Sequence, residues 1–153
     1  LKKKGAKYNG FNMILGTWPR LFYYSNMDGA RELEPGLYGL SNHLIDTPWP
    51  KVERGKEKLA ALLKDNEKPS AERIFTMLAD MHHPEDSRLP DTGIGLEWER
   101  ILSSMFITCP VYGTRSSSVI IIDRAGHVTF TERAFNGHAE HWMSAVFEFG
   151  IPA

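Results

Sequence analysis

The stretch SSSVIIIDRAGHVTFTER, residues 116–133, decides the fold class of this chain. Two runs rich in β-branched and aromatic residues flank the tetrapeptide DRAG, residues 123–126. A short turn containing Asp and Gly between two such runs is typical of a β-hairpin. The sequence therefore predicts two neighbouring antiparallel strands in the last third of the chain.

Further strand patterns lie on both sides of this hairpin. Downstream, WMSAVFEF (residues 142–149) predicts another strand, with Met143, Ala145, Phe147 and Phe149 on one face. Near the start, YNGFNMIL (8–15) and RLFYYSN (20–26) predict a pair of antiparallel strands. The glycine-containing run GLYGLSN (36–42) predicts a third, short strand that ends at Asn42.

Two helices are expected between these groups of strands. Val52, Leu59, Leu62 and Leu63 recur at helical spacing after Pro50. Ser70 is a candidate N-cap for a second helix, whose apolar stripe comprises Ile74, Met77, Leu78 and Met81. Strands and helices do not alternate, so the expected class is α+β with mostly antiparallel strands and two main helices, in a single domain over residues 1–153.

Composition excludes several classes of function. The chain has 153 residues and a formal net charge of −1, without the basic excess of a nucleic-acid binder. No apolar run reaches the length of a membrane span. A single cysteine, Cys109, cannot form an intrachain disulfide and is consistent with a reducing compartment. We therefore expect a cytoplasmic protein without a membrane span.

Three residues are candidates for ligand binding: Asn42, Trp49 and Arg115. The amide of Asn42 either caps backbone groups or donates to a substrate oxyanion. Trp49, between two prolines, is either a buried anchor or a wall on which a ligand stacks. Arg115 is either part of a structural ion pair or a carboxylate or phosphate receptor.

Metal binding is not predicted. His138 and His141 lie three residues apart, but no cysteine or carboxylate cluster completes a zinc set. Ser116, Ser117 and Ser118 have no evident general base beside them, so no serine nucleophile is proposed.

Several motifs together resemble the Transport and Golgi Organisation family, also named NRDE after an Asn-Arg-Asp-Glu motif. These motifs are YNGFN, PGLYGLSNHLIDTPWPKV, YGTRSSSVIIID, HVTFTER and the closing HW…FEF, and GIGLEWERILSS resembles the bacterial branch. The resemblance implies part of a four-layer αββα sandwich of the N-terminal-nucleophile hydrolase type, in which an N-terminal cysteine attacks an amide. In that fold Asn42 would contribute to the oxyanion hole, and Arg115 would line the pocket of the nucleophile.

The sequence departs from the family in two respects. It contains neither an N-terminal Met-Cys nor the Asn-Arg-Asp-Glu motif, and Cys109 is internal and so has no free amine. We therefore expect the C-terminal portion of a longer protein, which pairs with its missing N-terminal segment, self-associates or is poorly soluble.

Two functions follow from the resemblance as expectations. The first is a ligand-handling role, such as intracellular haem mobilisation or trafficking, with haem as the candidate ligand and no certain cofactor. The alternative is an amidohydrolase or acyltransferase acting on a small acyl or amide compound, with its nucleophilic cysteine in the missing part.

Overall fold

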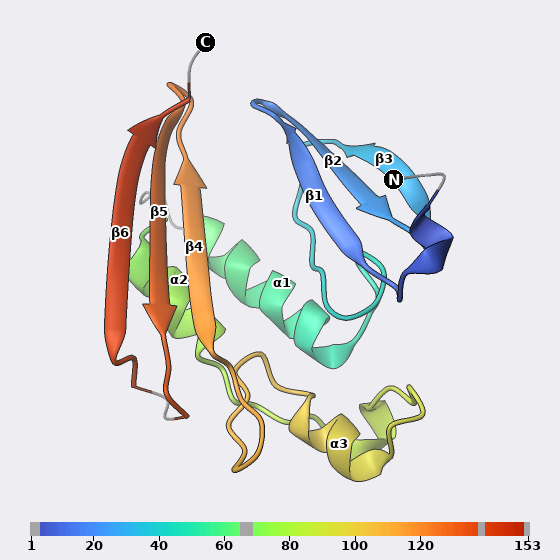
Figure 1. The fold of residues 1–153 in the computed structure, drawn as a ribbon. Helices are drawn as coiled ribbons and strands as arrows, with labels where there is room; N and C mark the ends of the chain where they lie inside the picture. The colour runs from blue at the N-terminus through green and yellow to red at the C-terminus, as the bar shows by residue number, and fades with distance from the viewer. Residues whose placement is uncertain (1–3, 65–68, 138–139, 152–153) are drawn as a thin grey trace. The chain divides into compact units, whose positions relative to one another are not determined.

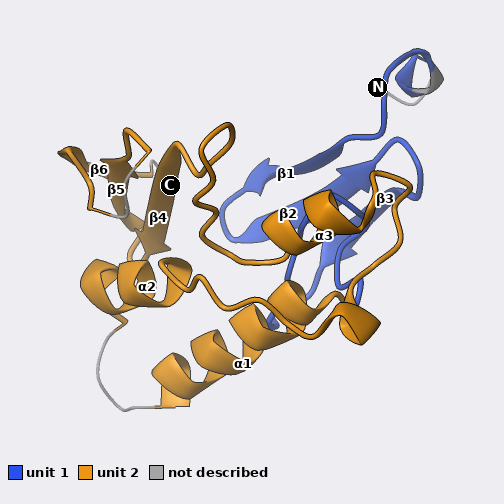
Figure 2. Cartoon of the chain, turned by 90° about the horizontal axis from the view of Figure 1, so that it is seen from below, with its two compact units in different colours: residues 1–48 blue, residues 49–153 orange. Residues whose placement is uncertain are grey.

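The computed structural model describes residues 4–64, 69–137 and 140–151. The chain divides into two compact units, Leu1–Pro48 and Trp49–Ala153 (Figure 2), called unit 1 and unit 2 below.

Unit 1 is built around a three-stranded antiparallel sheet in the order β1-β2-β3 (Figure 1). Its elements are a short 3-10 helix, η1 (Gly5–Lys7), followed by β1 (Asn12–Thr17), β2 (Arg20–Ser25) and β3 (Gly29–Leu33). The predicted pairing of the first two strands is confirmed, with Ile14 opposite Tyr23. The turn before β3 places Gly29 at φ 84°, a conformation that favours glycine.

The predicted strand at residues 36–42 is wrong. This segment has no strand pairing and instead closes back on itself through Asp46. Gly39 N donates to Asp46 Oδ1 at 2.9 Å, and Asp46 N donates to Gly39 O at 2.7 Å. These local bonds occupy backbone groups of Gly39 and Asp46, so the segment is a compact loop rather than a strand.

Unit 2 contains the second antiparallel sheet, ordered β4-β5-β6, with α2 packed against both α1 and β4 (Figure 1). The elements in chain order are α1 (Pro50–Lys64), α2 (Ala71–Leu78), η2 (Asp86–Arg88), α3 (Leu96–Ile101), β4 (Ser116–Ile122), β5 (His127–Ala134) and β6 (Met143–Gly150). Two three-stranded antiparallel sheets and two main helices confirm the α+β class.

The predicted hairpin and the presence of both predicted helices are confirmed. β4 pairs with β5 across a turn that holds Gly126 at φ 81°. β6 pairs with β5 in a register that sets Phe130 opposite Phe147, and their rings stack with centroids 5.9 Å apart. Ser70 caps α2, because its Oγ accepts a hydrogen bond from Arg73 N at 3.3 Å.

The last part of the predicted apolar stripe lies outside the helix. α2 ends at Leu78, so Met81 is in the following segment and is exposed. Phe75 is the buried residue of α2.

The two faces of the β4-β5-β6 sheet differ in how they are covered. Arg133 lies on the face toward α2, with its guanidinium 4.2 Å from the centre of the Phe75 ring. Ile120, Phe147 and Phe149 alternate to the other face, called the outer face here, and are 62%, 55% and 52% exposed. Unit 2 therefore leaves an apolar sheet surface uncovered by its own residues.

Candidate functional site

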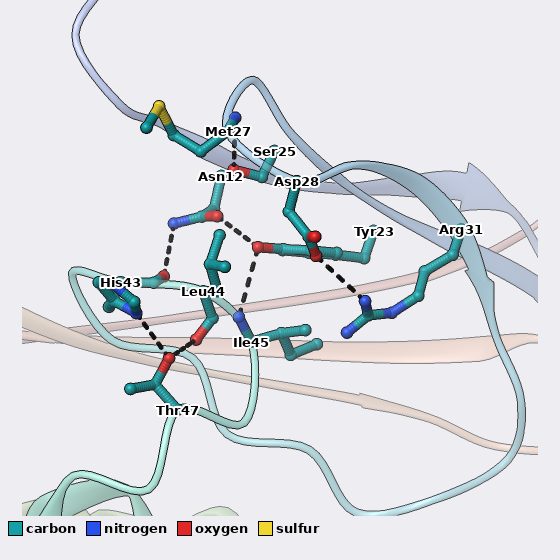
Figure 3. Close-up of polar contacts among 10 residues, drawn as sticks. All are labelled: Asn12, Tyr23, Ser25, Met27, Asp28, Arg31, His43, Leu44, Ile45 and Thr47. Carbon is teal, nitrogen blue, oxygen red and sulfur yellow. Dashed lines mark hydrogen bonds and ion pairs between the residues drawn. The ribbon is translucent and has the colours of Figure 1, made fainter.

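The loop of residues 34–48 is fastened to the unit 1 sheet by one buried tyrosine. The Tyr23 side chain is fully buried, and its hydroxyl donates to Asn12 Oδ1 at 2.6 Å. The same hydroxyl accepts a hydrogen bond from Ile45 N at 3.3 Å. Asn12 Nδ2 donates to His43 O at 2.9 Å, so one asparagine and one tyrosine hold two points of the loop (Figure 3).

A second set of bonds orients His43 within this loop. The Thr47 hydroxyl donates to Leu44 O at 2.8 Å, and His43 Nδ1 lies 2.8 Å from the same hydroxyl oxygen (Figure 3). Since the hydroxyl proton is already used, His43 Nδ1 carries the proton that closes this contact. In the neutral ring, the lone pair is then on Nε2.

A cleft of about 360 Å³ opens between the sheet and this loop, entirely within unit 1. Its walls combine apolar side chains with amides, a hydroxyl and an imidazole. They are formed by Gly10, Phe11, Asn12, Ser25, Met27, Asn42, His43 and Leu44. Apolar walls with a few placed polar groups are typical of small-molecule sites.

Asn42 is a polar group of this cleft that is available to a ligand. Its side chain is exposed, and the described residues give it no hydrogen bond. The amide of Asn12, in contrast, is used on both its oxygen and its nitrogen. Asn42 can therefore offer a ligand two N–H donors and one carbonyl acceptor.

The other two predicted site residues belong to unit 2. Trp49 is half-buried, and its carbonyl oxygen accepts from Val52 N at 2.8 Å, which starts α1. The Arg115 side chain is exposed, and no ion pair joins it to the residues that the structure describes. The convergence of Asn42, Trp49 and Arg115 on one pocket stays a prediction.

Comparison with known proteins identifies the family. The family described as "Transport and Golgi organisation 2" matches residues 1–137 of the chain. The chain belongs to this family.

Relatives from animals align with this chain over nearly its whole length. The Transport and Golgi organization protein 2 homolog of Bos taurus is 40% identical over 171 residues, which cover 99% of this chain and 61% of the relative. The homolog of Homo sapiens is 34% identical over 163 residues, which cover 97% of this chain and 59% of the relative. The Drosophila melanogaster protein is 27% identical, over 92% of this chain and 54% of its own length. This Transport and Golgi organisation 2 sequence thus spans about three fifths of the mammalian relatives that it matches.

Unit 2 of this family member holds a separate polar cluster around Asp80. The Asp80 carboxylate is buried and accepts from Arg54 Nε at 2.7 Å, Lys58 Nζ at 2.5 Å and His82 N at 2.9 Å. Burial alone would raise the pKa of Asp80, but the hydrogen bonds from Lys58, His82 N and Arg54 and the charge of Lys58 lower it well below its ordinary range. The charges are paired within the protein, so we interpret the cluster as structural.

The described residues were compared with two further kinds of feature, a metal-binding cluster and a membrane-spanning helix. Within residues 4–64, 69–137 and 140–151, no three or more His, Cys, Asp or Glu side chains gather in a way that could hold a metal ion. His138 lies outside the described residues, so its pairing with His141 is not described. In the same part of the chain, none of the helices combines the length and apolar character needed to cross a bilayer.

Sequence reasoning missed the residues that shape the cleft, above all Asn12, Tyr23 and Met27. A tyrosine within an apolar strand indicates a hydroxyl that needs a partner. Its partner could not be named, because the contact depends on strand register and on the path of a loop about 20 residues away.

Proposed function

We propose that this Transport and Golgi organisation 2 family member binds a small, largely apolar ligand in the unit 1 cleft and transfers it within the cytoplasm. The observation that carries the proposal is the cleft itself, with the hydrogen-bonding groups of Asn42 unused above a wall that Tyr23 and Asn12 hold in place. Family membership supports a role in transport more than it supports any particular reaction.

The chemistry of the cleft fits an amphipathic ligand. Phe11, Met27 and Leu44 supply apolar contact area, and Asn42 supplies the polar contact. A volume of about 360 Å³ is within the usual range for small-molecule pockets, near its lower end. A larger ligand would therefore leave part of its surface outside the cleft.

Haem is the ligand we propose first. His43 and Met27 line the same cleft, and imidazole and thioether groups are both ligands of haem iron. Bound haem would supply the iron to which these side chains bind. The contact between His43 Nδ1 and Thr47 fixes the ring, as hydrogen bonds to the non-ligating nitrogen do in metal sites.

The proposal extends to Arg115 and Trp49. The guanidinium of Arg115 is exposed and forms no ion pair with the described residues, so it is suited to bind a carboxylate such as a propionate. The indole ring of Trp49 is suited to stack on a flat ligand. We propose that both side chains take part in ligand binding in the full-length protein.

We further propose that additional polypeptide, such as an N-terminal segment of the same protein, covers the outer face. The support is the exposure of Ile120, Phe147 and Phe149, together with the greater length of the relatives. Exposed apolar surface of this kind typically marks an interface.

Haem titration into the full-length protein, followed by its Soret band, tests the proposal. We expect saturable binding at micromolar concentration, about tenfold weaker in Asn42→Ala because one hydrogen bond is lost. His43→Gln should also shift the Soret maximum, since an iron ligand is replaced.

The exposed residues Asn136 and His127 of unit 2 provide matched controls, as Asn136→Ala and His127→Gln. Both controls should bind haem like the unmodified protein. An unchanged Soret band at micromolar protein and haem would contradict haem as the ligand.

The alternative is an amidohydrolase or acyltransferase with an N-terminal cysteine. The observation that favours it is the unused amide of Asn42, which could donate to an oxyanion. A covalent cysteine probe applied to the full-length protein separates the two functions, because only the alternative requires labelling at the N-terminal residue.

A further inference from the structure

A second, smaller cavity lies in unit 2 between the inner face of the sheet and α2. It has a volume of about 60 Å³, and three aromatic rings form much of its wall. These rings belong to Phe75, Phe106 and Phe135. The rings of Phe106 and Phe135 meet edge to face with centroids 4.7 Å apart, so this wall is well packed.

One polar group of the cavity is buried without a partner. Arg133 lines the cavity, and its Nε is buried with no hydrogen bond within the described part of the chain. The rest of the guanidinium is held in place, because one terminal nitrogen pairs with Glu72 and the central carbon Cζ lies 4.2 Å from the centre of the Phe75 ring. A buried N–H without a partner destabilises the folded protein, because its bond to water is lost and not replaced. A polar occupant that accepts this N–H would offset that loss.

Ser117 supplies a second donor at the same place. It is the direct cross-strand neighbour of Arg133, so both side chains lie on the same face of the sheet. The described residues leave the Ser117 hydroxyl without a hydrogen bond. His141 lines the cavity as well, and the described residues give its ring no hydrogen bond.

We propose that this cavity binds a carboxylate, either a small free acid or the acidic end of a longer molecule. Arg133 Nε–H donates to one oxygen and the Ser117 hydroxyl to the other, while the aromatic wall contacts the carbon that bears the group. The volume exceeds the roughly 10–15 Å³ that one water requires and is enough for a carboxylate head.

The charge balance favours a carboxylate over a phosphate. Glu72 already offsets much of the Arg133 charge, so a dianion would be poorly neutralised beside three aromatic rings. The two donors, Arg133 Nε–H and the Ser117 hydroxyl, match the two oxygens of a carboxylate. A phosphate has more oxygens, and some of them would be left without a hydrogen bond.

Acetate titration of the full-length protein, monitored through the Nε–H resonances of its arginines by NMR, tests the proposal. We expect the Arg133 resonance to shift in a saturable way at millimolar acetate, and phosphate to act more weakly. Ser117→Ala should weaken acetate binding about tenfold. Arg133→Lys should abolish it, because lysine keeps the charge and loses the Nε donor.

Matched variants on exposed positions, Ser87→Ala and Arg124→Lys, should leave the acetate response unchanged. An Arg133 resonance that stays unchanged to about 100 mM acetate would mean that water alone occupies the cavity, and it would overturn the proposal. An acetate response that Ser117→Ala does not alter would also overturn the assigned geometry.

Discussion

At the scale of single residues, the unit 1 cleft depends on the hydroxyl of Tyr23. Tyr23→Phe leaves the buried Ile45 N and the part-buried Asn12 Oδ1 without their partner. We expect a loss of about 1–3 kcal/mol in the free energy of unfolding, measured by urea denaturation. Ligand binding should weaken too, because the loop carrying Asn42 is released.

Tyr38 offers a matched control for this substitution. Its hydroxyl donates to Glu34 O, but the side chain is exposed, so water replaces the bond in Tyr38→Phe. Its cost should stay within about 0.5 kcal/mol. Equal costs for the two variants would contradict the role assigned to Tyr23.

The type of a polar residue could be read from the sequence, but the way in which it is held could not. Asn42 lines a cleft, and its role in ligand binding stays a prediction. The proposed strand end was wrong, since Asn42 lies in a loop whose closure requires Asp46 in a left-handed conformation (φ 59°). An Asp that closes a loop and an Asp that caps a helix have the same local sequence signal.

At the scale of elements, Asp80 joins α1 to the segment after α2. Arg54 and Lys58 reach it from successive turns of α1. We expect Asp80→Asn to lower the free energy of unfolding by about 1–3 kcal/mol at pH 7. The partial exposure of both cations limits the cost, because water can solvate them.

The same carboxylate makes stability depend on pH. The pKa of Asp80 is lower in the folded protein than in the unfolded chain, where it is about 3.9. Its stabilisation is therefore complete above about pH 5 and is lost as the pH falls further. The difference between the unmodified protein and Asp80→Asn should shrink in acid, whereas exposed Glu57→Gln on the same helix should show little difference at any pH. A difference that does not change between pH 7 and pH 3 would contradict this.

Elements with a strong apolar period could be predicted, and short polar ones could not. β4, β5 and α1 follow clear patterns of β-branched or leucine residues. β3 has the sequence GAREL and pairs with β2. Its charged residues Arg31 and Glu32 interrupt the apolar pattern by which a strand is predicted. α3 is only six residues long and begins after a glycine at φ 87°, so neither a cap nor a full apolar stripe marks it.

At the scale of the whole molecule, the outer face of unit 2 has a direct consequence for residues 1–153 in isolation. We expect this chain to self-associate at micromolar concentration, as measured by sedimentation velocity, because Ile120, Phe147 and Phe149 are uncovered by unit 2. Ile120→Thr combined with Phe149→Thr should raise the concentration needed for association. Val111→Thr, at a 79% exposed position outside the sheet, is the control. A compact, soluble monomer of the unmodified chain would contradict the prediction.

The α+β class could be predicted because it depends only on the order of strands and helices. Four-layer packing and a shared pocket for Asn42 and Arg115 stay predictions, because they depend on contacts distant in sequence that local patterns do not specify.

The double use of the Asn12 amide has a consequence for selectivity. Its oxygen accepts from Tyr23 and one of its two N–H groups donates to His43 O, so the Asn12 amide keeps at most one N–H donor for a guest molecule. Asn42 is then the principal polar contact, and a carboxamide can rotate to present either its oxygen or its nitrogen. Such a cleft would bind both carbonyl and hydroxyl compounds and would discriminate among them by the size and shape of their apolar part.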